Sequence, residues 1–179
     1  ANTDEIAHLV HEGTLDCAIN GGFITYPPYI NVVPLMKDPL VLIASPHHPL
    51  AKLKVVTPEH LKNAPFIIHA TNSQLFEVFK TTMDSMGLTS NIIMSLGNID
   101  AIKQAVAADL GLAFSPYSAV ALEIEMGLLT KLPLKAFHTA YPYSIIHHSH
   151  KFLSPATFKL LEMIKSDCQT DVCKNTAKK

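Results

Sequence analysis

The sequence predicts an α/β fold built from two lobes. Strand-like and helical patterns alternate along most of the chain, which favours mostly parallel sheets covered by helices. Hydrophobic residues make up 48% and charged residues 16%, as in a packed globular protein. The segment Pro46-His47-His48-Pro49 can continue neither a helix nor a strand, and it indicates a linker between the lobes.

The first elements follow from stop signals and β-rich runs. A helix is expected over Glu5–Glu12, because Gly13 is a typical residue just after a helix end. A short apolar strand is expected over Leu15–Asn20. Two runs rich in Val, Ile and Leu, Ile30–Met36 and Pro39–Ser45, predict two further strands.

Capping signals mark the helices of the middle region. Thr57 followed by a proline predicts the start of a short helix. A strand is expected over Pro65–His69. Thr71 and Gln74 have the spacing of a capping box, which predicts a helix that starts after Thr71 and runs to Met86.

The same signals place the last elements and a polar tail. We expect a disordered tail over 171–179, after a helix that frays from about Ser166. The other expected elements are strand Ile92–Leu96, a helix from Asn98 to Ala108, strand Leu110–Phe114, helix Tyr117–Met126, strands Leu128–Leu132 and Tyr143–His148, and a helix capped by Ser154.

Composition limits the function classes. The net charge is −1 and all 14 basic residues are Lys, so neither a basic DNA-binding face nor an arginine clamp is available. A bound anion would have to be held by backbone N–H groups, hydroxyls, amides or Lys. The sequence has no apolar run of membrane-spanning length and no signal-peptide pattern at its start. Three sparse cysteines fit a reducing cytoplasm better than a disulfide framework.

No motif supports an enzyme or a bound cofactor. GxSxG, Walker A, GxGxxG and HExxH patterns are all missing, so we expect no catalytic residues and no cofactor. His148 and His150 could share one strand face and ligate a metal together. Without a supporting motif, we expect no functional metal site.

Polar and small residues at strand ends and helix N-termini are the candidate ligand contacts. In α/β folds, ligands bind where such ends face a crevice, and helix N-termini favour anions. Helix capping and plain turn formation explain the same residues equally well. The candidates are Asn20, Gly21, Gly22, Thr71, Asn72, Ser73, Asn98, Ile99, Ser115 and Pro116.

Several motifs, in this order and spacing, resemble the effector-binding domain of LysR-type transcription regulators. The resemblance runs from about Asp4 to Ile164, and the stretch around Asn98 looks most like regulators of carbon-fixation operons. Asp109 departs from the family pattern, which often has Gly there. The motifs are Gly13–Ile19, Asp38–Ser45, His48–Ala51, Asn98–Ala108, Gly111–Pro116 and Ser154-Pro155.

This resemblance implies two Rossmann-like lobes with a hinge, of the type 2 periplasmic-binding-protein kind. The first lobe would comprise 1–50 and 144–170, and the second 51–143. A small-molecule effector would bind between them. The chain would lack the family's first strand and helix and its DNA-binding domain. It would act in the cytoplasm as a homo-oligomer, a dimer or tetramer, without touching DNA or membranes itself.

Two other classes remain as alternatives. A periplasmic-type solute-binding protein for a small anion shares this fold but serves transport. An enzyme on the same scaffold is the third hypothesis, and the missing catalytic motifs weigh against it.

Overall fold

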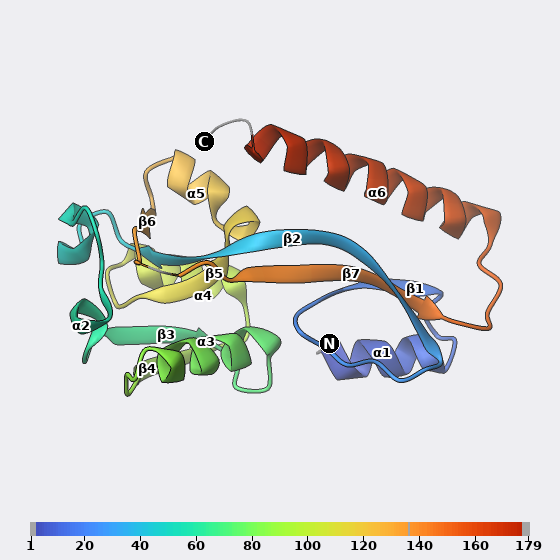
Figure 1. The fold of residues 1–179 in the computed structure, drawn as a ribbon, viewed down its shortest axis with the longest axis horizontal. Helices are drawn as coiled ribbons and strands as arrows, with labels where there is room; N and C mark the ends of the chain where they lie inside the picture. The colour runs from blue at the N-terminus through green and yellow to red at the C-terminus, as the bar shows by residue number, and fades with distance from the viewer. Residues whose placement is uncertain (1–2, 136, 177–179) are drawn as a thin grey trace. The chain divides into compact units, whose positions relative to one another are not determined.

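Two units make up the chain, each with its own strands and helices, and we describe them separately. In the computed structural model, residues 3–135 and 137–176 are described (Figure 1). Unit 1 comprises Ala1–Lys37 and Tyr141–Lys179, and unit 2 comprises Asp38–Ala140. These boundaries fall earlier in the chain than the lobe limits at 50/51 and 143/144, which stay a prediction.

Unit 1 is a small antiparallel arrangement that begins and ends with a helix in sequence. Strands β1 and β7 are antiparallel, with Ile19 opposite Ile145, and β7 also neighbours β2. Val10 of the first helix packs with Ile30 and Ile146 in a buried apolar cluster. The elements are α1 (Thr3–His11), β1 (Cys17–Gly21), the first part of β2 (Ile30–Ala44), β7 (Ala140–His148) and α6 (Pro155–Thr176).

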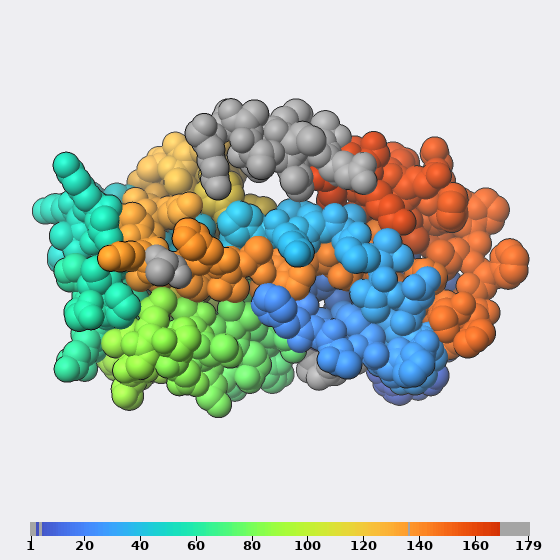
Figure 2. Space-filling model, in the orientation of Figure 1, coloured from blue at the N-terminus to red at the C-terminus, as the bar shows by residue number. Residues whose placement is uncertain are grey.

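Strand β2 is continuous where the sequence predicted two strands. It runs from Ile30 to Ala44 and so belongs to both units. Pro34 and Pro39 do not end it, because the fixed φ of proline suits extended backbone and only an N–H donor is lost. Its first part is partly exposed, as at Val32, and atoms of this strand (light blue) reach the surface drawn in Figure 2.

Unit 2 contains the parallel pairing that the sequence predicted. Strands β3 and β4 are parallel, and the Phe66–Leu112 bridge continues this direction towards β5. The second part of β2 pairs with β5 and β6, and both of these ladders are antiparallel. The expectation of mostly parallel sheets is therefore wrong for the chain as a whole, because β2 and β7 run antiparallel to their partners in the ladders just described. The strands are β3 (Pro65–His69), β4 (Asn91–Leu96), β5 (Ala113–Pro116) and β6 (Thr130–Leu132).

Helices α3 and α4 pack against strand β3 of unit 2. Ile67 of that strand is buried with Ile102 and Val106 of α4. The helix expected over Tyr117–Met126 is instead a 3-10 turn followed by a short α-helix, with Val120 between them. The helical elements are η1 (Pro49–Lys52), α2 (Pro58–Leu61), α3 (Gln74–Ser85), α4 (Ile99–Ala107), η2 (Tyr117–Ala119) and α5 (Ala121–Glu125).

Helix α6 extends further than the sequence pattern indicated. It begins after Ser154, whose hydroxyl accepts a hydrogen bond from Thr157 N at 3.1 Å, and it ends at Thr176. Neither Gly nor Pro interrupts it after Pro155, so local hydrogen bonding continues through the polar segment. The expected tail at 171–179 is thus helical to Thr176, and 177–179 lie outside the described residues.

Candidate functional site

The carboxyl ends of three strands meet at one edge of unit 2. Ala70 N donates to Leu96 O at 2.9 Å, which holds the segments after β3 and β4 side by side. Leu112 N donates to Pro65 O at 2.8 Å, in the parallel bridge that sets β5 beside β3. Three groups of predicted residues therefore lie at this edge: Thr71 to Ser73, Asn98 with Ile99, and Ser115 with Pro116.

The cap of α3 is Ser73 rather than Thr71. The Ser73 hydroxyl accepts a hydrogen bond from Phe76 N at 3.2 Å, and Gln74 is the first helical residue. The capping box predicted for Thr71 and Gln74 is wrong, because Ser73 N donates to Ala70 O and a turn precedes the helix. Thr71 and Asn72 are exposed, so their side chains are open to a ligand.

The cap of α4 is Asn98, as predicted. Its Oδ1 accepts a hydrogen bond from Asp100 N at 2.7 Å. Ile99 packs its side chain against the core, so only its backbone N–H could donate a hydrogen bond to a ligand. Lys103 Nζ lies 2.8 Å from Asp100 Oδ1 and 2.7 Å from Glu123 Oε1, which ties this first turn to α5.

Two of the predicted contacts at this edge are buried. Ser115 has no exposed surface, and its hydroxyl donates to Pro116 O at 3.2 Å. Pro116 is buried as well. As ligand contacts these two residues stay a prediction, and they would have to form the floor of a site.

In unit 1, close packing accounts for Gly21. A Cβ built there would lie 2.5 Å from Tyr141 Cε1 and 2.9 Å from Tyr143 Cε1, so a side chain has no room. Asn20 is 4% exposed and its Nδ2 donates to Thr3 O at 3.4 Å. Gly22 has a φ of 121°, which glycine adopts readily. Their contact with a ligand stays a prediction.

His69 is a further polar residue at this edge, and local sequence patterns did not identify it. It is the last residue of β3, directly before the segment that contains Thr71, and its Nδ1 is buried without a hydrogen-bond partner among the described residues. Burial lowers the pKa of His69. Its place at a strand end, beside a helix N-terminus, was the signal that could have identified it.

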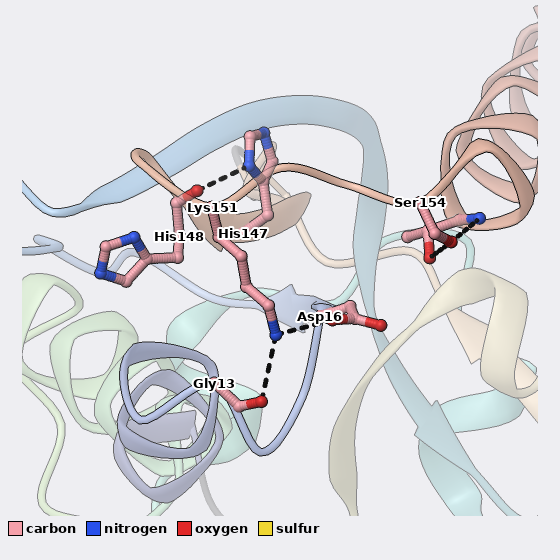
Figure 3. A network of polar contacts seen from close by, with 7 residues as sticks. Gly13, Asp16, His147, His148, Lys151 and Ser154 are labelled. Carbon is pink, nitrogen blue, oxygen red and sulfur yellow. Dashed lines mark hydrogen bonds and ion pairs between the residues drawn. The ribbon is translucent and has the colours of Figure 1, made fainter.

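The histidines considered for metal binding serve other contacts. His148 Nδ1 accepts a hydrogen bond from His150 N at 3.1 Å, and Figure 3 shows the rings of His147 and His148 pointing apart. No group of three possible ligands able to hold a metal occurs within 3–135 and 137–176. Nearby, Lys151 Nζ lies 2.7 Å from Asp16 Oδ1 (Figure 3), which joins the turn before β1 to the segment after β7.

Comparison with known proteins gives a consistent family assignment. A family model described as the LysR substrate binding domain matches residues 1–169. A probable RuBisCO transcriptional regulator of Cyanidioschyzon merolae is 30% identical over 168 residues, which are 91% of this chain and 55% of that protein. One from Cyanophora paradoxa is 31% identical over 160 residues, covering 87% and 49% of the two chains. The chain thus spans about half the length of the curated relatives it matches.

Solved structures confirm the predicted fold class. The regulatory domain of Synechocystis PCC6803 CcmR, in complex with 2-PG, has a TM-score of 0.81 at 24% identity, over 94% of this chain and 80% of that one. The effector binding domain of QuiR, in complex with shikimate, has a TM-score of 0.80 at 18% identity, over 95% and 79%. None of the helices within the described residues has the length and apolar character needed to cross a bilayer.

Proposed function

Because the chain belongs to the LysR substrate-binding domain family, we propose that it senses a small organic anion through the edge of unit 2 where α3 and α4 begin. The observation that carries this proposal is the meeting of two helix N-termini beside the carboxyl ends of β3 and β4. The first N–H groups of a helix have no partner within the helix, and its dipole favours negative charge there.

The side chains at this edge suit an anion that is bound without arginine. Thr71 and Asn72 offer an exposed hydroxyl and an exposed amide, and Ser73 adds a second hydroxyl. His69 Nδ1 is a further group able to donate a hydrogen bond once the ring has the matching tautomer. The buried pair Ser115 and Pro116 would lie beneath these groups, and Asn20, Gly21 and Gly22 of unit 1 are proposed as separate contacts.

Calorimetry with a panel of small carboxylates, phosphate esters and uncharged analogues tests this proposal. Asn72→Ala is expected to weaken binding of the preferred anion about fivefold to tenfold, since a hydrogen bond to a charged group is lost. Thr81→Ala is the matched control, because Thr81 is exposed on α3 and its hydroxyl donates to Glu77 O instead. Preference for uncharged, apolar compounds would contradict the proposal.

In the whole protein, this domain would regulate transcription in the cytoplasm. All of the relatives named above are described as regulators or as regulatory or effector-binding domains, which favours a sensor over a solute-binding protein of transport. The RuBisCO regulators named above favour a carbon-fixation operon as the target of this regulator. DNA would be contacted through a part of the protein outside this chain. Effector binding would shift the regulator between conformations that differ in affinity for the effector.

The regulator is proposed to act as a homodimer or tetramer. Leu122 and Met126, at α5 and its end, are each 64% exposed, and such apolar side chains suit a subunit contact. Light scattering of the full-length regulator, with and without the selected anion, tests the oligomeric state. Binding of the same samples to operator DNA is measured alongside. A monomer at micromolar concentration would argue against an oligomer.

A further inference from the structure

A hollow of unit 2 lies at the C-terminal end of α3, opposite the helix start that carries the proposed anion site. Its volume is about 420 Å³, within the range of roughly 300–1,000 Å³ that small-molecule sites occupy. Helix α3 has 12 residues, so its two ends are separated by about 17 Å at the usual rise per residue. The lining residues are Pro58, Thr82, Ser85, Met86, Lys135, Phe137, His138 and Thr139.

Three separate parts of unit 2 form the walls of this hollow. They are the start of α2, the last turn of α3, and residues 135 and 137–139, which follow β6. On the face drawn in Figure 2, orange atoms from this part of the chain lie beside the turquoise atoms around α2 and above the green atoms. Lys135 is anchored there through its backbone, since its N donates to Val56 O at 2.9 Å.

Lys135, the cation in this hollow, makes no direct ion pair with any of the described residues. No ion pair or side-chain hydrogen bond holds Lys135 Nζ in the part of the chain that the structure describes. The charge of Lys135 contributes to the lowered pKa of the Glu59 carboxyl group, but the main cause of that lowering is a hydrogen bond with Thr57. The ammonium group is therefore available to an anion from solution.

The end of α3 does not oppose a negative ligand strongly. Leu88 N donates to Met83 O at 3.0 Å and Gly87 N donates to Asp84 O at 3.0 Å, so carbonyls of the last turn are already paired. Ser85 Oγ donates to Thr82 O at 2.7 Å, which satisfies another one. The negative end of the helix is thereby partly neutralised before a ligand arrives.

We propose that this hollow binds a small organic anion, with Lys135 and His138 contacting its oxyanion group. The hydroxyl of Thr139 supplies a further hydrogen bond. The apolar side chains of Pro58, Met86 and Phe137 contact a short carbon skeleton. The ligand is a carboxylate or a phosphate ester, since both present the same oxyanion chemistry to Lys and His. This site is independent of the one proposed at the start of α3.

Titration of the 179-residue chain with succinate and with glycerol 3-phosphate, followed by backbone amide NMR, tests the inference. Glycerol is the uncharged control. Either anion is expected to shift amides at 82–86, 135 and 137–139, and the stronger binder identifies the oxyanion class. Failure of both anions to shift these amides would overturn the proposal.

Matched variants assign the site. Lys135→Gln is expected to weaken binding of the stronger anion about tenfold or more. Lys131→Gln removes an exposed lysine of β6 in the same region and is expected to change affinity less than about twofold. Ser85→Phe should fill the hollow and abolish binding, with circular dichroism confirming that it folds. Equal effects of the two lysine variants would refute the site.

The two proposals fail in distinguishable ways. Asn72→Ala should leave succinate or glycerol 3-phosphate binding at Lys135 unchanged. If the anions shift only amides at 71–73 and 98–99, the proposal for this hollow is wrong and the site at the start of α3 is supported.

Discussion

Replacing Gly21 with Ala is expected to destabilise unit 1 through steric overlap alone. The new Cβ would lie 2.5 Å from Tyr141 Cε1 and 2.9 Å from Tyr143 Cε1. Ordinary contact begins at 3.4 Å, so the ring of Tyr141 would have to move by about 1 Å. Tyr141 is only 6% exposed and has little room to move.

Overpacking of this kind costs about 1–3 kcal/mol. For a chain of this size, that loss corresponds to a fall of roughly 3–10 °C in the melting temperature. Urea unfolding followed by circular dichroism measures it directly. Gly97→Ala is the matched control, because a Cβ at Gly97 meets nothing within 4 Å, and its effect should stay within about 0.5 kcal/mol.

This pair of variants also separates the two explanations of Gly21. If Gly21→Ala unfolds at the same urea concentration as Gly97→Ala yet binds the effector poorly, contact with a ligand explains the glycine and the packing argument is refuted. If the stability of Gly21→Ala falls as expected, the close approach of the two tyrosine rings is sufficient to explain why position 21 is glycine.

Three further predictions concern a helix cap, the half-buried His69 and the buried Asp38. Ser73→Ala should lower the free energy of unfolding by about 1 kcal/mol, whereas Thr71→Ala should change it little; the reverse order in urea unfolding would restore Thr71 as the cap. Burial lowers the pKa of His69, so its contribution to stability is present above its ordinary value of 6.5 and is lost as pH falls through its folded pKa. His69→Gln should therefore gain stability relative to the natural chain as pH falls below 6.5. If the urea midpoints of the variant and the natural chain differ by the same amount at about pH 7.5 and about pH 5.5, this prediction is contradicted. Burial raises the pKa of Asp38 more than its hydrogen bonds with Ser118 lower it, so its contribution is present below 3.8 and is lost as pH rises through its folded pKa. Asp38→Asn should thus gain relative stability between about pH 4 and 7, and a difference that shrinks over this range would refute the argument.

Local patterns predicted most elements of this chain correctly. Strand Pro65–His69 was predicted at its observed limits, and the Asn98 cap was identified, because both depend on neighbours within a few residues. The same reasoning failed at Thr71. Ser73 lies two positions later and is an equally good cap, and only the turn closed by Ser73 N and Ala70 O decides between them.

The candidate site was predicted in parts but not as a whole. Residues at strand ends and helix starts could be listed, since these positions follow from the local pattern. Sequence could not tell that Ser115 is buried, that Gly21 makes room for Tyr141, or that Lys135 makes no direct ion pair with any of the described residues. Each of these depends on residues far away in the chain.

By itself, the sequence determined the alternation of strands and helices, the caps and stops that bound them, and the absence of arginine. These are properties of residue type and of short-range spacing. The tertiary structure decided that β2 is one strand shared by two units, and that α3 and α4 begin at the same edge. It also decided which polar groups are buried. The physical reason is that burial, register and strand direction arise from contacts between distant segments, and local preference carries no information about which segments will meet.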